Sequence, residues 1–177
     1  MCLSCQRVNK QFYYFCDRET GMDKQIQPSV PDYPAEREID YDIAIIYDKE
    51  DFQDVLEFKE HLVTDVLESK DKQNISVVSF DTTMMETIRK VLTKSRFAFL
   101  FLTRSFCEES WPRLSQESVV RNVLYGDDSG CMIVPIFTVN RSESTFKIPL
   151  GLNVLKGLRY CDRDQFYKSS VIKLLSH

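Results

Sequence analysis

The chain alternates between short blocks that are almost wholly apolar and longer segments in which apolar residues recur every three or four positions. The blocks YDIAIIY (41–47), ISVVSF (75–80), FAFLFLT (97–103) and CMIVPIFTV (131–139) predict strands, and LKGLRY (155–160) predicts a short fifth strand. Because the blocks are continuous rather than alternating, we expect a sheet that is covered on both faces. FAFLFLT is the most apolar block and is predicted to be the central strand.

The segments between these blocks predict helices. Apolar residues from Phe52 to Leu67 follow the i, i+3, i+4 spacing of an amphipathic helix, and a shorter run from Met84 to Leu92 does the same. Further helices are predicted from about Arg113 to Tyr125, before Gly126, and from Gln165 to Leu175. This alternation predicts an α/β fold: a central five-stranded parallel sheet with right-handed crossovers and helices on both faces.

Residues 1–38 are predicted to be a largely irregular N-terminal extension, because Pro28, Pro31 and Pro34 interrupt a stretch without hydrophobic periodicity. The net charge of −4 gives no electrostatic reason to expect nucleic acid as a partner. No apolar run approaches the ~18 residues of a membrane span, and the opening MCLSCQRVNK lacks the apolar core of a signal peptide. We therefore expect a cytoplasmic protein with one domain at residues 39–177.

Cys2 and Cys5 form a C-x-x-C pair near the N-terminus. A zinc site takes about four ligands. Cys16 would supply a third, but His61 and His177 lie far away in the sequence, so we expect no metal. Free thiols in an irregular tail are one interpretation of the pair. S-acylation of Cys2 and Cys5, which would recruit the protein to membranes, is the alternative.

In a parallel α/β sheet, ligands and partners meet the loops at the carboxyl ends of the strands. Nucleotide-binding loops need glycine, and none of the five glycines follows the first strand, so no cofactor is expected. A phosphoacceptor domain needs an aspartate at the end of the third strand, where this chain has Thr103-Arg104. A nucleophile–histidine pair has only His61 to draw on, and we expect His61 to be a surface residue of its helix.

Four segments in this order resemble one known family. YDIAIIYDKED (41–51), TKSRFAFLFLTRSFCEESW (93–111), CMIVPIF (131–137) and Gln165-Phe166-Tyr167 are similar to motifs of the Toll/interleukin-1 receptor (TIR) domain. The resemblance covers about residues 39–177 and implies the flavodoxin-like fold of that family. It also implies homotypic association with TIR domains of receptors or adaptors, or with a second copy of the chain, in innate immune or interleukin-type signalling. The family-motif positions are Asp42, Tyr47, Asp51, Phe106, Trp111, Phe166 and Tyr167.

The loop after the second strand departs from the family's pattern. TIR domains usually carry Arg-Asp-x-x-Pro-Gly there, whereas this chain has a shorter connection with neither proline nor glycine. The resemblance implies a contracted version of the family's principal contact loop, formed by Asp81, Thr82, Thr83, Met84, Met85 and Glu86. The two methionines are open to two interpretations: adaptable contact residues, or the start of the next helix's buried face.

Some TIR domains hydrolyse NAD with a glutamate four residues after the tryptophan. Here that position is Ser115, and Glu117 would face elsewhere on a continuous helix. Glu108 and Glu109 precede Trp111 and are expected to be solvated loop charges. We therefore expect a non-enzymatic signalling module, with an NAD hydrolase that uses Glu117 as the alternative. A receptor tail would need a membrane span just upstream, and residues 1–38 contain none, so an adaptor is predicted and a receptor tail is the alternative.

Overall fold

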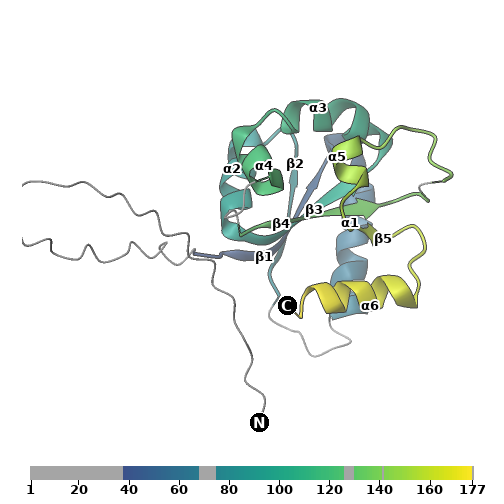
Figure 1. Cartoon of the computed structure of the whole chain (residues 1–177). Helices are drawn as coiled ribbons and strands as arrows, with labels where there is room; N and C mark the ends of the chain where they lie inside the picture. The colour runs from purple at the N-terminus through teal and green to yellow at the C-terminus, as the bar shows by residue number, and fades with distance from the viewer. Residues whose placement is uncertain (1–37, 68–74, 126–129, 141, 177) are drawn as a thin grey trace, which may run out of the picture. The chain divides into compact units, whose positions relative to one another are not determined.

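A computed structural model describes residues 38–67, 75–125, 130–140 and 142–176 of the chain (Figure 1). Its strands are β1 (Tyr41–Tyr47), β2 (Val77–Asp81), β3 (Ser95–Leu102), β4 (Met132–Phe137) and β5 (Leu158–Arg159). They form one parallel sheet in the order β2-β1-β3-β4-β5. This is the strand order of flavodoxin-like folds, so the predicted fold class is confirmed.

Helices cover both faces of the sheet. One face carries α1 (Phe52–His61), the π-helical segment η2 (Leu62–Leu67) and α6 (Gln165–Leu174). The opposite face carries α2 (Met85–Lys94), the π-helical turn η4 (Phe106–Ser110), α3 (Trp111–Leu114), α4 (Ser118–Tyr125) and α5 (Leu150–Asn153). A 3-10 turn, η1 (Lys49–Asp51), leads from β1 into α1.

The core is divided by β3, the central strand of the sheet. Phe97, Phe99 and Phe101 point into the cluster beneath α1 and α6, while the alternating Ala98, Leu100 and Leu102 point into the cluster beneath α2 to α5. All six side chains are buried. A strand covered on both faces is continuously apolar, so the prediction that FAFLFLT is central is confirmed.

The predicted helix from Arg113 to Tyr125 is wrong as a single element, because α3 ends at Leu114 and α4 begins at Ser118. The backbone N–H groups of Gln116 and Glu117 bond to carbonyls three residues back, at Arg113 and Leu114, which tightens the chain into a terminating turn. The Gln116 side chain also donates to the Pro112 carbonyl at 2.9 Å, which occupies an acceptor of the first turn.

Two other elements differ from their predictions. The helix predicted from Phe52 to Leu67 changes to π-helical geometry at Leu62, next to Thr64, whose hydroxyl bonds to the Glu60 carbonyl at 2.8 Å. The predicted strand 155–160 is reduced to Leu158–Arg159. The Phe137 carbonyl faces β5, where it accepts from the Cys161 N–H, so Pro135 faces the same way and has no N–H with which to extend the ladder.

His61 is not the surface residue that its place in the helix predicts. Its side chain is largely buried, its Nδ1 lies 2.7 Å from an Asp65 carboxylate oxygen, and its ring stacks on that of Tyr167 at 5.8 Å. The reason is the position of α6, which packs against η2 and places Tyr167 on the His61 ring. Helical periodicity predicts which face of a helix is apolar, but it does not predict that another helix, here α6, covers the residues beside that face.

Candidate functional site

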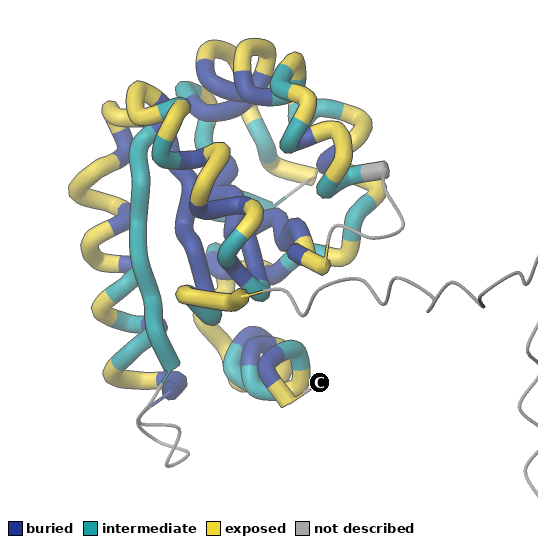
Figure 2. The backbone as a smooth tube through the Cα atoms, turned by 90° about the vertical axis from the view of Figure 1, so that its left-hand side faces the viewer, coloured by how far each residue is buried: buried dark blue, intermediate teal, exposed yellow. Residues whose placement is uncertain are grey.

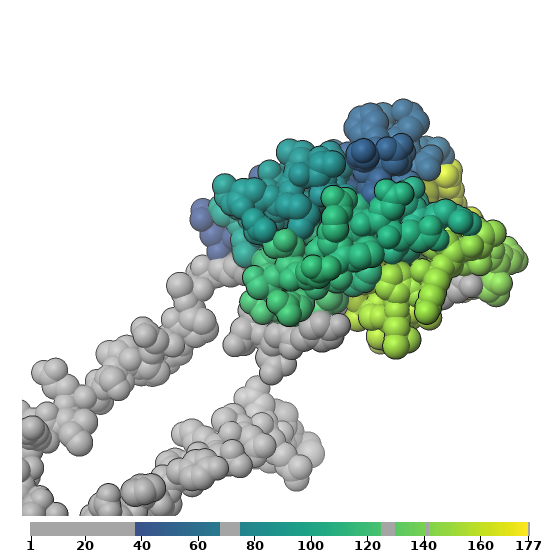
Figure 3. Space-filling model, turned by 90° about the horizontal axis from the view of Figure 1, so that it is seen from above, coloured from purple at the N-terminus to yellow at the C-terminus, as the bar shows by residue number. Residues whose placement is uncertain are grey.

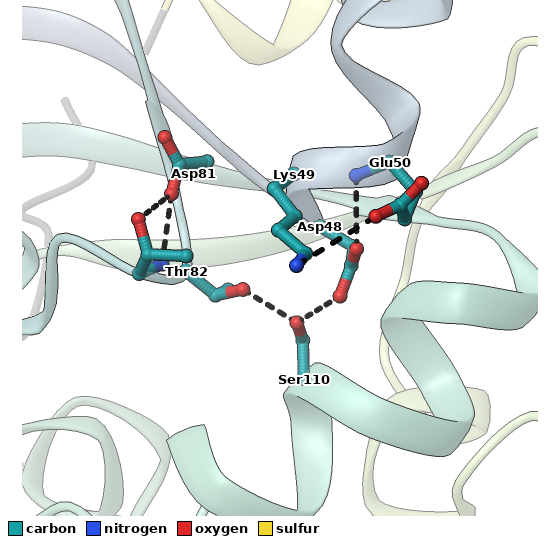
Figure 4. A network of polar contacts seen from close by, with 7 residues as sticks. Asp48, Lys49, Glu50, Asp81, Thr82 and Ser110 are labelled. Carbon is teal, nitrogen blue, oxygen red and sulfur yellow. Dashed lines mark hydrogen bonds and ion pairs between the residues drawn. The ribbon is translucent and has the colours of Figure 1, made fainter.

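Three loops meet at the carboxyl ends of β1, β2 and β3, where they are joined by buried polar side chains (Figure 4). Asp48 follows β1, Thr82 follows β2, and Ser110 ends η4. The Ser110 hydroxyl donates to one oxygen of the Asp48 carboxylate, and the hydroxyls of Thr82 and Ser110 lie 2.5 Å apart. The other Asp48 oxygen accepts from the N–H of Glu50 at 3.0 Å. We call Asp48, Thr82 and Ser110 the loop network.

The loop network joins the three loops through buried hydrogen bonds. All three side chains are buried, and a buried carboxylate is tolerated only where donors satisfy it. With Ser110 donating to Asp48, the Thr82 hydroxyl must donate to Ser110, so the three groups form one directed chain. The Thr82 N–H also donates to the Tyr47 carbonyl at 2.9 Å. The prediction that Thr82 belongs to an exposed contact loop is therefore wrong.

Asp81, the last residue of β2, shapes the turn that follows it. Its carboxylate accepts a hydrogen bond from the Thr83 N–H at 2.8 Å and another from the Thr83 hydroxyl. Its carbonyl accepts from the Met84 N–H at 3.1 Å. A short aspartate side chain that bonds two residues ahead closes such a turn without glycine or proline. This accounts for the contracted loop that the sequence shows.

The two methionines have different environments. Met84 is 44% exposed, whereas Met85 is half-buried and packs on the core cluster beneath α2. Glu86, at the start of α2, is exposed and pairs with Arg89 at 3.0 Å and Lys90 at 3.8 Å. The exposed part of the predicted contact loop is thus Thr83, Met84 and Glu86, which we call the contact tip. Met85 thus starts the buried face of α2, whereas Met84 is exposed and stays a predicted contact residue.

Asp51 is a second buried carboxylate at this edge of the sheet. It accepts a hydrogen bond from the Thr103 hydroxyl at 2.5 Å, which joins the β1–α1 turn to the end of β3. Burial raises the pKa of Asp51 to about 6, with contributions from the neighbouring Asp48, Asp54 and Glu50 carboxylates, and the Thr103 hydrogen bond offsets part of this shift. The Asp51 carboxylate is therefore costly for the fold when it is ionised.

Replacing Asp51 with asparagine should change how stability depends on pH. Well below pH 4 the carboxyl group is protonated in both the folded and the unfolded chain, and its burial carries no penalty. As pH rises from about 4 to about 6, the unfolded chain ionises first, and stability is lost until the folded carboxyl also ionises. Between pH 3.5 and 7.5 the free energy of unfolding of the wild-type protein should fall by about 1–2 kcal/mol relative to that of Asp51→Asn. This is less than the maximum effect of a pKa shift, which is about 1.4 kcal/mol for each pKa unit. Urea denaturation at several pH values measures the difference. A difference that stays constant with pH would contradict the shifted pKa.

Four of the family-motif positions have structural roles. Asp42 accepts from the Ser76 N–H at 3.0 Å and fixes the start of β2 against β1. Tyr47 is buried at the end of β1. Phe106 and Trp111, also buried, lie with their ring centroids 6.4 Å apart and anchor η4 and α3 on the core. These residues hold the strands and loops in position, and three of them, Tyr47, Phe106 and Trp111, are buried.

The remaining two motif positions, Phe166 and Tyr167, have opposite environments. Asp164 caps α6 by accepting from the Tyr167 N–H at 2.8 Å, and this orientation turns Tyr167 inward and leaves Phe166 81% exposed. Burial raises the pKa of the Tyr167 phenol above its ordinary value. Tyr167 therefore packs in the core, whereas Phe166 is available on the surface.

The candidate catalytic residue, Glu117, is engaged in an ion pair. It lies between α3 and α4, and its carboxylate contacts the Arg89 guanidinium at 2.8 and 2.9 Å. Glu117 does not share a continuous helix with Trp111, because the helix is interrupted there. Glu108 and Glu109 are exposed, as predicted, although they lie on η4 rather than in a loop. Glu117 therefore links α4 to α2.

Residues of the loop network are largely hidden from reasoning on the sequence. Asp48 appears in the sequence analysis only within the acidic turn of YDIAIIYDKED, Thr82 only within the predicted contact loop, and no pattern singles out Ser110. Asp48 and Thr82 are small polar residues just after a strand, and Ser110 is one just before a buried tryptophan. Such positions are common, so they are a weak signal for a buried hydrogen-bond network. Their importance follows from the parallel sheet, which brings residues 48, 82 and 110 to one edge (Figure 3 shows α1 in blue, α2 in teal and α3–α4 in green meeting on that side).

Comparisons with known proteins add a likeness of fold. No family model and no curated protein matches the sequence. Among solved structures, the chain is similar to the TIR domain of the Toll-related receptor TRR-2 from the lower metazoan Hydra magnipapillata, at 16% identity. The likeness covers 77% of this chain and 99% of that one, with a TM-score of 0.45. These values do not establish family or function.

Two further properties concern the described part of the chain. Within residues 38–67, 75–125, 130–140 and 142–176, no three His, Cys, Asp or Glu side chains are grouped so that they could hold a metal ion. None of the described helices is long and apolar enough to span a bilayer. Cys2 and Cys5 lie outside the described residues, as does nearly all of the predicted extension 1–38, so both predictions stand untested.

Proposed function

We propose that the protein is a non-enzymatic TIR signalling module that associates with TIR domains of receptors or adaptors and acts as an adaptor in innate immune or interleukin-type signalling. The observation that carries the proposal is the convergence of the motif segments. The acidic turn after β1 and the segment that leads through Ser110 to Trp111 are far apart in sequence, and Ser110 bonds directly to Asp48. Residues that resemble one family's motifs thus also hold one another in place.

The contact tip is the surface that we propose for partner binding. It stands at the carboxyl edge of the sheet, where partners of such folds bind, and its base is fixed by the loop network and the Asp81 turn. Binding energy concentrates in a few side chains that lose all contact with water. Met84 is flexible, polarisable and exposed, so it is the residue of this surface with most to gain from burial.

Replacing Met84 with alanine should weaken co-precipitation with a TIR partner at least about tenfold, the effect of losing a hot-spot contact of about 1.4 kcal/mol or more. The measurement is binding to a panel of receptor and adaptor TIR domains, with the melting temperature recorded for each variant. Met132→Ala is the matched control, because Met132 is 54% exposed but begins β4, and so lies at the amino-terminal ends of the strands, away from the contact tip.

Met85→Ala completes the test. Met85 packs on the core, so this variant should lower the melting temperature. Unchanged binding by Met84→Ala, or an equal loss with Met132→Ala, would contradict the contact tip as the binding surface.

Absence of NAD hydrolysis is the second expected outcome. The purified full chain should not release nicotinamide from NAD, because Ser115 stands where hydrolytic TIR domains have glutamate and the Glu117 carboxylate is paired with Arg89. Chromatography of the reaction mixture measures this, and an NAD-hydrolysing TIR domain assayed in parallel shows that the conditions support turnover. Turnover that disappears in Glu117→Ala would establish the enzyme alternative instead.

The adaptor role and the cytoplasmic location have their own test. A membrane-spanning segment encoded upstream of residue 1 would make the protein a receptor tail rather than an adaptor. Recruitment of an adaptor to membranes would occur through its partners or through acylation of Cys2 and Cys5. Fractionation of cells that express the chain with both cysteines changed to serine separates these two routes.

A further inference from the structure

The outer edge of β2 has backbone groups without a strand to pair with. β2 is the terminal strand of the sheet, and in Figure 2 it is the straight teal segment that no other drawn segment crosses. The Ile43 N–H bonds to the Ser76 carbonyl and the Thr82 N–H bonds to the Tyr47 carbonyl. Because backbone groups alternate in direction along a strand, the N–H and C=O groups of Val77 and Ser79 point away from β1. No described strand lies there.

Natural edge strands are usually protected from pairing by lysine, proline or a bulge. β2 has none of these from Val77 to Phe80. Its only charged residue is Asp81 at the very end, whose carboxylate is already bound to Thr83. The side chains of all five residues are half-buried, so a strand added at this edge would cover them further. The open backbone groups define what would fit: an extended chain.

Helix α1 adds an apolar margin beside this edge. Phe52 and Leu56, one turn apart on α1, are 58% and 48% exposed. The opposite flank of α1 carries His61, which packs against Tyr160 and Tyr167 near β5 and α6. Phe52 and Leu56 therefore lie on the flank directed towards β2. Exposed large apolar side chains next to an open strand edge favour burial by a partner.

We infer that β2 pairs antiparallel with β2 of a second copy of the chain, with Val78 of both copies opposite each other on a twofold axis. In this register Val77 and Ser79 exchange hydrogen bonds with Ser79 and Val77 of the second copy. Val78 faces Val78, a β-branched pair that suits a sheet. A register centred on Ser79 would instead place the Asp81 carboxylate against Val77 at both ends of the pair.

Twofold symmetry favours a second copy of the chain as the partner of the β2 edge. A closed twofold contact uses the same patch on both chains, and a strand that is uncharged around its centre meets itself without like-charge repulsion. The axis stands perpendicular to the sheet, so both α1 helices lie on the same face and bring Phe52 and Leu56 of each copy towards the axis. Pairing then joins the sheets and buries these four side chains.

This dimer is independent of the proposed TIR association, because it uses the edge of β2 and not the contact tip. Met84→Ala should leave it intact, and variants of the β2 edge should leave binding to TIR partners intact. Failure of either proposal is thus visible separately. Sedimentation velocity of the full chain over a range of concentrations should show a monomer–dimer equilibrium.

Proline at position 79 tests the backbone contact. Ser79→Pro removes the outward N–H from both copies without touching the ladder to β1, and edge strands accept proline at such positions. The dimer dissociation constant should rise at least about tenfold, whereas Ser79→Ala, which keeps the N–H, should dimerise like the wild type. Where circular dichroism shows that Ser79→Pro does not fold, Leu56→Glu, on the exposed α1 flank, should weaken the dimer instead.

Cysteine cross-linking tests the register. Residues opposite each other in a pair without hydrogen bonds lie about 4.5 Å apart between Cα atoms, within the range that a disulfide spans. Oxidation of the Val78→Cys variant should therefore give a dimer joined by a disulfide between position 78 of the two copies, identified by mass spectrometry of the joined peptide. Ser79→Cys is the matched control, since its equivalent lies two residues out of register. A monomer at every concentration, or linkage at Ser79→Cys equal to that at Val78→Cys, would overturn the inference.

Discussion

Truncating Leu100 to alanine is expected to lower the free energy of unfolding by about 2–5 kcal/mol, the range for deleting a buried leucine side chain. Leu100 is fully buried in β3, opposite Ile46 of β1 on one side and Pro135 of β4 on the other. With a neighbouring strand on each side and α2 to α5 above it, the site has little freedom to collapse around the missing atoms. Urea denaturation monitored by circular dichroism measures the change.

Leu150→Ala is the matched control for this variant. Leu150 begins α5 and is exposed, so its truncation should change stability by no more than about 0.5 kcal/mol. A loss below about 1 kcal/mol for Leu100→Ala would show that β3 is not held between two covered faces. The central position of the strand in the sheet would then be wrong.

Replacing Ser110 with alanine is the second large effect. Its hydroxyl is fully buried and is the only link between Asp48 and Thr82 in the loop network. Removing it leaves the Thr82 hydroxyl and one oxygen of the Asp48 carboxylate without partners, and each buried orphan costs about 1–3 kcal/mol, more when charged. We expect a total loss of about 2–5 kcal/mol in the same denaturation experiment.

The control for Ser110→Ala is Ser169→Ala, the same change on the exposed face of α6, which should be nearly neutral. Thr82→Val adds a second test, because it removes the donor at the end of the chain while Ser110 and Asp48 stay bonded. Its cost should be smaller than that of Ser110→Ala. Equal costs for the two variants would contradict the direction assigned to the hydrogen bonds.

The parallel sheet could be predicted from the sequence because its strands are continuous apolar blocks. Phe97 to Leu102 is the clearest case: a strand buried on both faces has no polar alternation to obscure it. Element ends were less predictable. The interruption of the helix at Ser115 to Glu117 depends on a side-chain hydrogen bond from Gln116, and the shortening of β5 depends on the direction in which Pro135 faces. Neither is visible in a hydrophobic pattern.

The sequence predicts where the candidate site lies in the fold, but not which residues are buried in it. Strand order brings the loop after β2 to the carboxyl edge, which the sequence indicates through its alternation of elements. Whether Thr82 or Thr83 is buried depends on where β2 ends. Because Asp81 is its last residue, Thr82 still bonds to β1 and turns inward. A shift of one residue exchanges the buried and exposed positions, and no local signal fixes it.

The loop network also has a consequence for the order of folding. Its bonds join residues 62 and 28 positions apart in the chain, so they can form only after β1, β2 and β3 have docked and η4 has been placed. Folding nuclei consist mainly of local contacts and a few long-range apolar ones, so we expect this buried polar network to form late. Ser110→Ala should therefore leave the folding rate nearly unchanged and accelerate unfolding. The loop network thus forms late in folding and slows unfolding by holding the three loops together once the sheet has formed.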